Sequence, residues 1–147
     1  EKWPMIHMEI KSEVHEDDRK AIVDAMLAFN ASKIGDDGYE PLAILLRNDN
    51  GEVQGGLTAK CYYRWLFIEL LFVPEIQRGA SLGKELIARA EEWAKGRGCV
   101  GVWLDTFTFQ APGFYEKQGY SKFATLEHYP DATTQRLFFR KIFADKQ

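Results

Sequence analysis

The sequence is poor in the residues that build metal centres and disulfide frameworks. Only two cysteines and three histidines occur in 147 residues, the cysteines form no CxxC pair, and no histidine cluster lies near them. A zinc site is therefore not expected. Cys61 and Cys99 are interpreted as two buried thiols, with a disulfide as the alternative. We predict no metal cofactor.

The chain also lacks a long apolar run and a strong charge of one sign. Its longest near-continuous apolar stretch, WLFIELLFV, falls well short of the roughly 20 residues that a membrane helix needs. The N-terminal residues do not have the pattern of a signal peptide. A net charge of −3 provides no electrostatic reason to expect nucleic acid. These absences predict a cytoplasmic protein without membrane or nucleic-acid partners.

What is present is a globular composition, with 46% hydrophobic and 14% aromatic residues, which predicts a single domain over residues 1–147. Hydrophobic periodicity and turn signals predict ten elements. In chain order these are a strand at 6–14, a helix from 17 to 34, strands at 41–48 and 52–63, a strand at 65–73 buried on both faces, a helix at 81–97, a strand at 100–106, a short helix at 112–117, and strands at 120–126 and 135–142. The fold class is α/β, a mixed sheet with helices packed on it.

The segment between the buried strand and the second long helix has the properties of an anion site. It reads Gln77-Arg78-Gly79-Ala80-Ser81-Leu82-Gly83-Lys84. A strand, a glycine-bearing turn and a helix N-terminus together present backbone N–H groups and a positive dipole end. The two glycines allow a close approach of phosphate oxygens, and the arginine and lysine add positive charge. The alternatives are a nucleotide-binding loop and a turn that only starts a helix.

A nucleotide-binding P-loop does not fit this segment. Its GxxxxGK[ST] pattern needs one residue more between the glycines than Gly79 and Gly83 leave, and Glu85 stands where a magnesium-binding hydroxyl is required. The segment instead resembles the R/Q-x-x-G-x-G/A loop of the GNAT N-acetyltransferases, with Arg78 first and Gly83 last. Ser81 stands where that family usually has glycine, and serine is a good helix N-cap.

A second motif supports the same resemblance. Residues 110–120, QAPGFYEKQGY, look like the A-x-x-F-Y-x-x-x-G-F/Y stretch of the GNAT superfamily. The resemblance implies a mostly antiparallel sheet with a splayed strand pair, between which acetyl-CoA inserts its pantetheine arm. It also implies a set of cofactor-binding residues, namely Leu71, Phe72, Val73, Arg78, Gly79, Ala80, Ser81, Leu82, Gly83 and Lys84. The family often has asparagine where this chain has Thr108, and Gln110 or Thr106 could take over that contact.

The resemblance assigns the general acid to Tyr115, which would lie beside the thioester sulfur. A phenol can protonate the departing thiolate because the ordinary pKa values of the two groups are comparable. A half-buried aromatic side chain of an amphipathic helix is the structural alternative.

Three side chains compete for the role of general base. Glu69 lies inside a strongly apolar strand, where a buried carboxyl with a raised pKa would suit the task. Its structural alternative is an ion pair with Arg64 or Arg140. Asp105 is the rival base, whereas His128 lies in a late loop and is interpreted as exposed.

The sequence does not specify the acceptor beyond an amine on a small molecule or peptide. Tyr62, Tyr63, Phe107 and Tyr129 are candidates to line its pocket, together with the segments 34–40 and 122–134. A homodimer is compatible with the aromatic, strand-rich C-terminus. The alternative function is a non-catalytic acyl-CoA-binding module on the same fold.

Overall fold

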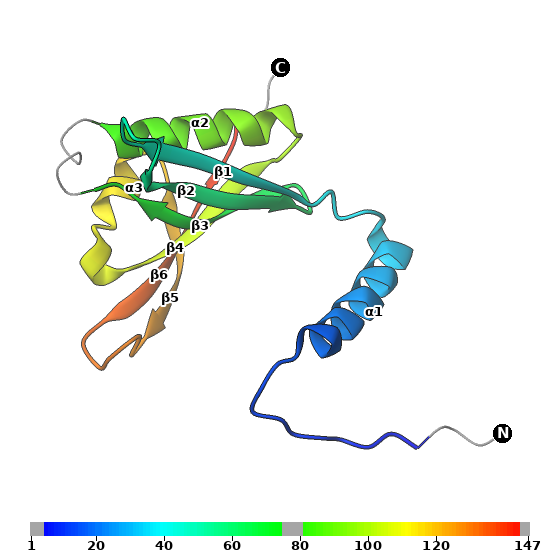
Figure 1. The fold of residues 1–147 in the computed structure, drawn as a ribbon. Helices are drawn as coiled ribbons and strands as arrows, with labels where there is room; N and C mark the ends of the chain where they lie inside the picture. Colours follow the sequence, from blue (N-terminus) through cyan, green and yellow to red (C-terminus); the bar gives the residue numbers. More distant parts are fainter. Residues whose placement is uncertain (1–4, 75–80, 145–147) are drawn as a thin grey trace. The chain divides into compact units, whose positions relative to one another are not determined.

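The computed structural model describes residues 5–74 and 81–144 of the chain, which divide into two compact units, Glu1–Asp37 and Gly38–Gln147 (Figure 1). Each unit is described by itself. The loop residues Arg78, Gly79 and Ala80, which the resemblance assigns to cofactor binding, lie outside the described residues.

Within its described residues, 5–37, the N-terminal unit contains one helix, α1 (Glu16–Ile34). Three acidic residues occupy its first turn, where the helix dipole favours negative charge. At the other end, Gly35 adopts a φ of 81° and its N–H donates to the carbonyl of Ala31 at 3.0 Å. The predicted helix is therefore confirmed, including its glycine terminator.

The strand predicted at 6–14 is wrong. Described residues 5–15 contain only bends and irregular backbone. An alternating apolar pattern creates a face that a strand could bury, but a strand forms only where a neighbouring strand takes up its backbone N–H and C=O groups. Within the described part of this unit, no second strand is present to do so.

The second unit is a six-stranded sheet with the order β1-β2-β3-β4-β6-β5 (Figure 1). Its strands are β1 (Glu40–Arg47), β2 (Val53–Tyr62), β3 (Trp65–Phe72), β4 (Gly101–Phe107), β5 (Ser121–Glu127) and β6 (Gln135–Ile142). Only β3 and β4 pair in parallel, and the other neighbours are antiparallel. The predicted tight turn joins β1 to β2, where the N–H of Gly51 donates to the carbonyl of Asn48 at 3.0 Å.

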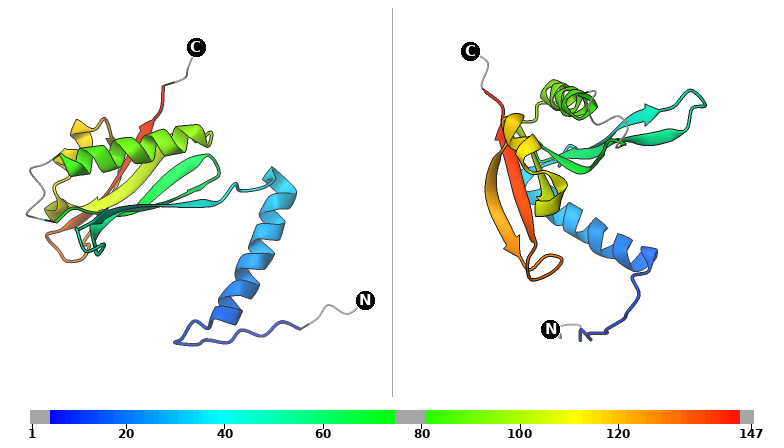
Figure 2. Two further views of the ribbon diagram at one scale, coloured as in Figure 1. Left: turned by 45° about the horizontal axis from the view of Figure 1, so that its top comes forward. Right: turned by 90° about the vertical axis from the view of Figure 1, so that its left-hand side faces the viewer.

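Helix α2 (Leu82–Gly96) lies along one face of this sheet (Figure 2). Its buried residues follow the helical period that the sequence predicts. They pack against the inward-facing side chains of the central strands. The shared core consists of Leu57, Ala59, Cys61, Leu66, Ile68, Leu86, Ile87, Ala90, Ala94, Cys99, Val102, Leu104, Tyr115, Tyr120, Leu137 and Phe139. Burying a large apolar side chain contributes roughly 1.5–3 kcal/mol.

Strand β3 is not buried on both faces, contrary to the prediction. Leu66 and Ile68 are buried beneath α2, whereas Leu70 is 66% exposed and Phe72 is 55% exposed. The reason is that α2 packs on a single face of the sheet, so a continuous apolar run does not by itself show that both faces are covered.

The two cysteines are free thiols buried in this unit, as the sequence predicts. Their sulfur atoms lie 2.6 Å apart, and burial raises the pKa of the Cys99 thiol to about 12 with a further contribution from Cys61.

Among the described residues, no helix is both long enough and apolar enough to cross a membrane.

Candidate active site

The site begins where two parallel strands part. Strand β3 pairs with β4 from Trp65 opposite Gly101 to Ile68 opposite Leu104, and the pairing ends there although both strands continue. The ends of β3 and β4 therefore diverge at the middle of the sheet. This is the splayed strand pair that the family resemblance implies.

A β-bulge marks the same point on β3. Ile68 pairs with Ala59 and Leu70 pairs with Thr58, so Glu69 is the extra residue of the bulged strand. A bulge re-aims the side chain that it carries, and bulges are frequent next to active sites. Glu69 thus follows the last position at which β3 pairs with β4, immediately before the strands part.

The environment of Glu69 differs from the prediction. Its side chain is 44% exposed rather than buried, and its partner is Lys60 rather than Arg64 or Arg140. The carboxylate oxygen lies 3.7 Å from the Lys60 nitrogen, which is a loose ion pair. The prediction failed because the bulge places Glu69 in a part of β3 where the neighbouring residue Leu70 is also exposed, so the carboxylate is solvated.

A cavity of about 640 Å³ opens beside the diverging strands. Eight of its lining residues were assigned to the site from the sequence, namely Leu71, Phe72, Val73, Ser81, Gly83, Lys84, Gln110 and Tyr115. Three further lining residues, Ala111, Phe114 and Gln118, were missed, although the first two are motif positions that the sequence displays. Leu82, Thr108 and the predicted base Glu69 are not among the described lining residues.

The start of α2 forms one wall of this cavity. A Cβ atom added at Gly83 would lie 3.2 Å from the Phe114 ring, so the missing side chain lets that ring pack against the first turn. The absence of a side chain at Gly83 therefore lets the loop motif pack against the second motif. Lys84 is exposed at the same helix end, which is the end that favours anions.

Ser81 does not act as a side-chain N-cap. Its side chain makes no capping hydrogen bond, and its backbone adopts the left-handed conformation with a φ of 60°. Its carbonyl accepts the hydrogen bond from the N–H of Glu85 at 3.1 Å. The position therefore has the backbone geometry that suits glycine, the residue usual in the family, and serine adopts it at a cost.

Ser81→Gly is expected to stabilise the protein by about 0.5 kcal/mol. Relieving the strain of a left-handed non-glycine residue stabilises the folded state by roughly 1–2 kcal/mol. The greater freedom of glycine in the unfolded chain offsets roughly 0.4–1 kcal/mol of this gain. Urea unfolding measures the change. Ser121→Gly is the matched control: Ser121 opens β5 without a positive φ, so glycine should destabilise it. Equal losses in both variants would contradict the assignment of strain.

Tyr115 lies on α3 (Gly113–Lys117), the short helix that the sequence predicts. Its ring is buried among three other aromatic rings, those of Phe114, Tyr120 and Phe139. Burial raises the pKa of the Tyr115 phenol to about 12, and the negative charge of Asp105 contributes to the shift. The phenol is therefore protonated at neutral pH and can act as a proton donor at the cavity wall.

Gln110 and Thr106, the two side chains considered as substitutes for the family's asparagine, form hydrogen bonds within the chain, as does Thr108 at the asparagine position. The side-chain oxygen of Gln110 accepts hydrogen bonds from the N–H of Phe107 at 2.8 Å and from the hydroxyl of Thr106 at 3.2 Å. The hydroxyl of Thr108 accepts from the N–H of Gln135 at 3.4 Å. These bonds build the 3-10 turn at Thr108–Gln110, an element that the sequence did not predict.

Asp105 also lies where the strands part, one residue beyond the last paired position of β4. Its carboxylate accepts a hydrogen bond from Arg136 at 2.7 Å, and the guanidinium is flanked by the rings of Tyr129 and Phe138. One carboxylate oxygen is thus occupied by a charge-assisted bond, which makes Asp105 less available as a proton acceptor than Glu69. His128 is exposed and lies outside the cavity, as predicted.

The four aromatic residues proposed for an acceptor pocket are divided between two places. Tyr62 and Tyr63 line a separate cavity of about 420 Å³ together with Trp65, Trp103, Phe123 and Arg140. Phe107 and Tyr129 stack on each other with ring centres 5.5 Å apart, next to the pair of Asp105 and Arg136. Of the two pairs, Phe107 and Tyr129 therefore lie near the carboxylate of Asp105, where β3 and β4 part.

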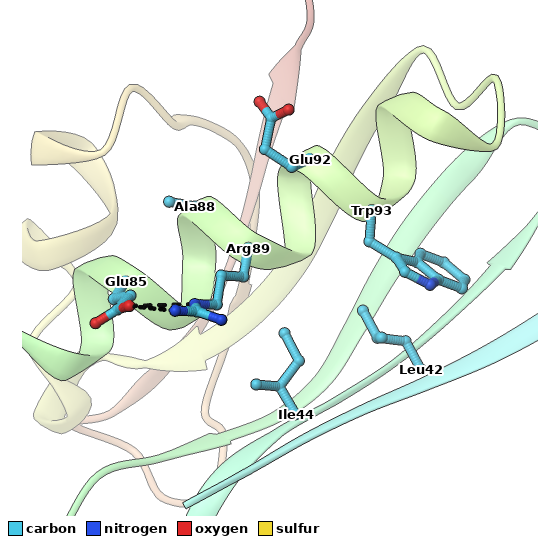
Figure 3. A pocket seen from close by; sticks show the side chains of 7 residues that line it. All are labelled: Leu42, Ile44, Glu85, Ala88, Arg89, Glu92 and Trp93. Atoms are coloured by element: carbon cyan, nitrogen blue, oxygen red, sulfur yellow. Dashed lines mark hydrogen bonds and ion pairs between the residues drawn. The ribbon is translucent and has the colours of Figure 1, made fainter.

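A third hollow lies between α2 and β1 (Figure 3). Leu42 and Ile44 of β1 face Arg89 and Trp93 of α2, and Arg89 is bonded to Glu85 at 2.7 Å. This groove is mostly apolar, and Tyr115 does not line it. It therefore lacks the groups that the chemistry of the candidate site requires.

Comparisons with known proteins agree with the geometry. The model of the acetyltransferase (GNAT) family matches residues 4–120. The chain belongs to this family. An acetyltransferase of Agrobacterium fabrum is 41% identical over 107 residues, covering 73% of this chain and 78% of that protein. The blasticidin-S acetyltransferase of Streptomyces morookaense is 42% identical over 95 residues, covering 64% of this chain and 70% of that protein.

Solved structures of the GNAT fold show the same architecture. A crystal structure of an Agrobacterium tumefaciens protein has a TM-score of 0.86 at 34% identity, covering 94% of this chain and 100% of that chain. A Bacillus anthracis structure in complex with acetyl coenzyme A has a TM-score of 0.62 at 23% identity, covering 71% of this chain and 63% of that chain. This GNAT protein is thus an acetyltransferase with a mixed sheet and flanking helices.

Proposed function

We propose that this GNAT acetyltransferase transfers the acetyl group of acetyl-CoA to an amine of a small molecule by direct attack on the thioester. The observation that carries the proposal is the cavity in which a protonated, buried phenol, the end of β3 and the start of α2 meet. The name of the blasticidin-S relative, which denotes a small-molecule acceptor, supports this class of substrate.

The residues of the cavity suit an elongated ligand that carries phosphates. The start of α2 offers backbone N–H groups and Lys84 to the phosphate end, while Leu71, Phe72 and Val73 line the wall toward the point of divergence. Acetyl-CoA would supply a thioester when bound. Tyr115, at the cavity wall, would hold the proton that the departing thiolate needs.

The transfer balances with the groups that the chain provides. The neutral amine nitrogen attacks the thioester carbonyl carbon, a C–N bond forms, the C–S bond breaks, and the thiolate takes the proton of Tyr115. Glu69 removes the excess proton of the amine, directly or through water. The products are an N-acetyl amide and CoA with a free thiol. Glu69 releases its proton to solvent, and a proton from solvent restores the phenol.

A thiol-release assay tests the proposed function. The full chain is mixed with acetyl-CoA and a panel of small amines, polyamines, aminoacyl nucleosides and lysine peptides, and free thiol and acetylated product are measured. Turnover with a small amine supports the proposal. Turnover restricted to lysine peptides overturns the acceptor class, and saturable CoA binding without transfer to any amine identifies a non-catalytic CoA-binding module.

Glu69→Gln is expected to lower kcat/KM for the amine by about 100-fold at neutral pH, because the amide cannot accept the amine proton. Steady-state kinetics with saturating acetyl-CoA measure the loss. Asp105→Asn is the comparison variant, since it replaces the rival carboxylate by an amide in the same way, and its loss should be much smaller. If Asp105→Asn loses about 100-fold and Glu69→Gln keeps its activity, the roles are reversed.

Oligomeric state is a separate proposal. Strand β5 is one of the two edge strands of the sheet, and its side chains Phe123 and Leu126 are 46% and 44% exposed. An apolar edge strand is a site at which two copies can associate, so sedimentation velocity at assay concentration tests the expected homodimer.

A further inference from the structure

A partly buried ionic cluster contacts the residues that follow α3, the short helix that carries Tyr115. Glu91 is in the middle of α2 and only 7% exposed, at a position of the helical period that otherwise carries core residues. Its carboxylate accepts hydrogen bonds from the hydroxyl of Tyr120 at 2.8 Å and from the ammonium of Lys141 at 2.9 Å. Lys141 also donates to the carbonyl of Gln118 at 3.0 Å.

This cluster contacts the segment that holds α3 in place. The carbonyl of Tyr115 accepts hydrogen bonds from the N–H groups of Gln118 and Tyr120, both at 3.0 Å. The residues bonded to Lys141 and Glu91 are therefore the same residues whose amides bond to Tyr115. A chain of direct hydrogen bonds thus joins α2 and β6 to the backbone of the proposed general acid.

A helix of five residues cannot hold its own geometry, because the cost of nucleating a helix exceeds what one turn returns. A buried ion pair, in turn, contributes little to stability compared with apolar residues of the same size. The cluster is therefore better explained by the geometry that it imposes than by the stability that it adds.

We infer that Glu91 and Lys141 are positioning residues for acetyl transfer, which act by fixing α3 so that the Tyr115 hydroxyl stays at the cavity. This inference rests on the proposed role of Tyr115. The burial of Tyr120 and the neighbouring charge of Glu91 raise the pKa of the Tyr120 phenol, so this phenol remains a hydrogen-bond donor to Glu91.

The test is the double variant Glu91→Leu/Lys141→Met, which removes both charges and leaves no buried charge unpaired. We expect kcat to fall about 10-fold or more, with CoA affinity and the KM for the amine within about twofold of the wild type. Amide hydrogen exchange at Gln118 and Tyr120 should accelerate while exchange in β2 and β4 stays unchanged. The matched control is Glu92→Leu/Lys95→Met, which removes an exposed pair on the same helix and should leave kcat unchanged.

A double-mutant cycle separates positioning from general damage. If the cluster acts through Tyr115, adding the double variant to Tyr115→Phe should cost little further activity, because the hydroxyl that it positions is already gone. Additive losses in kcat, or unchanged hydrogen exchange at Gln118 and Tyr120, would overturn the inference. If Tyr115→Phe alone is fully active, the role of Tyr115 fails, while the exchange measurement still reports on whether the cluster holds α3.

Discussion

Tyr115→Phe should lower kcat by about 100-fold or more while the Kd for CoA stays within about twofold. The substitution removes one oxygen, which in the proposed mechanism protonates the departing thiolate, and general acid catalysis of this kind contributes about 10²–10⁴-fold. The ring itself, which packs against Phe139 and Tyr120, is retained. Steady-state kinetics and calorimetric titration with CoA measure the two quantities separately.

Equal, large losses in turnover and CoA affinity would instead make Tyr115 a binding residue. The pH dependence gives a second criterion. Because the pKa of the Tyr115 phenol is raised to about 12, the acid form persists beyond the ordinary phenol value of about 10. Deprotonation of this group should therefore cause no alkaline fall in kcat near pH 10. If kcat of the wild type falls near pH 10 and kcat of Tyr115→Phe does not, the Tyr115 phenol has its ordinary pKa and the expectation is wrong.

Gly56→Ala is expected to destabilise the protein by about 3 kcal/mol. Gly56 has a φ of 139°, which residues with a Cβ atom rarely adopt, and a Cβ there would collide with the backbone carbonyl of Ile44. The backbones of two paired strands cannot separate without loss of ladder hydrogen bonds. Because Gly56 also pairs with Phe72 at the cavity wall, the variant should bind CoA more weakly. Urea unfolding and CoA titration measure both effects.

Gly96→Ala is the control, because it makes the same chemical change with nothing within 4 Å of the added atom. Gly96 is the last residue of α2, and alanine is the better helix former, so stability should rise by about 0.5–1 kcal/mol. A destabilisation of similar size at both positions would contradict the steric argument for Gly56.

Elements whose signals are local in the sequence were predicted well. The apolar period of α2, the turn at Asp49-Asn50-Gly51 and strand β6 all occur within one or two residues of their predicted positions. Helical period and turn chemistry depend on residues close in the chain, so neighbours in the sequence suffice to determine them. The motifs at the cavity are also local signals, since each spans one strand end or one helix end, and the binding and catalytic roles of their residues stay predictions.

Features that depend on distant partners were predicted poorly. The first strand has no pairing partner in its described unit, and the open face of β3 exposes Glu69 to solvent beside Lys60. Ser81 resembled a helix cap by its chemistry, but its backbone is left-handed and its side chain does not cap. Glu91 and Lys141 are 50 residues apart and only the fold brings them together.

The sequence alone determined the family, the cofactor class and the residue type at most cavity positions, because those signals are short-range patterns of glycine, aromatic and charged residues. Only the tertiary structure decided the environment of each group. It exposed Glu69, tied Asp105 to Arg136, occupied the side-chain oxygen of Gln110, and raised the pKa of Tyr115 through burial. The physical reason is that burial, hydrogen bonding and electrostatic fields come from atoms near in space, and the folded chain alone defines which atoms those are.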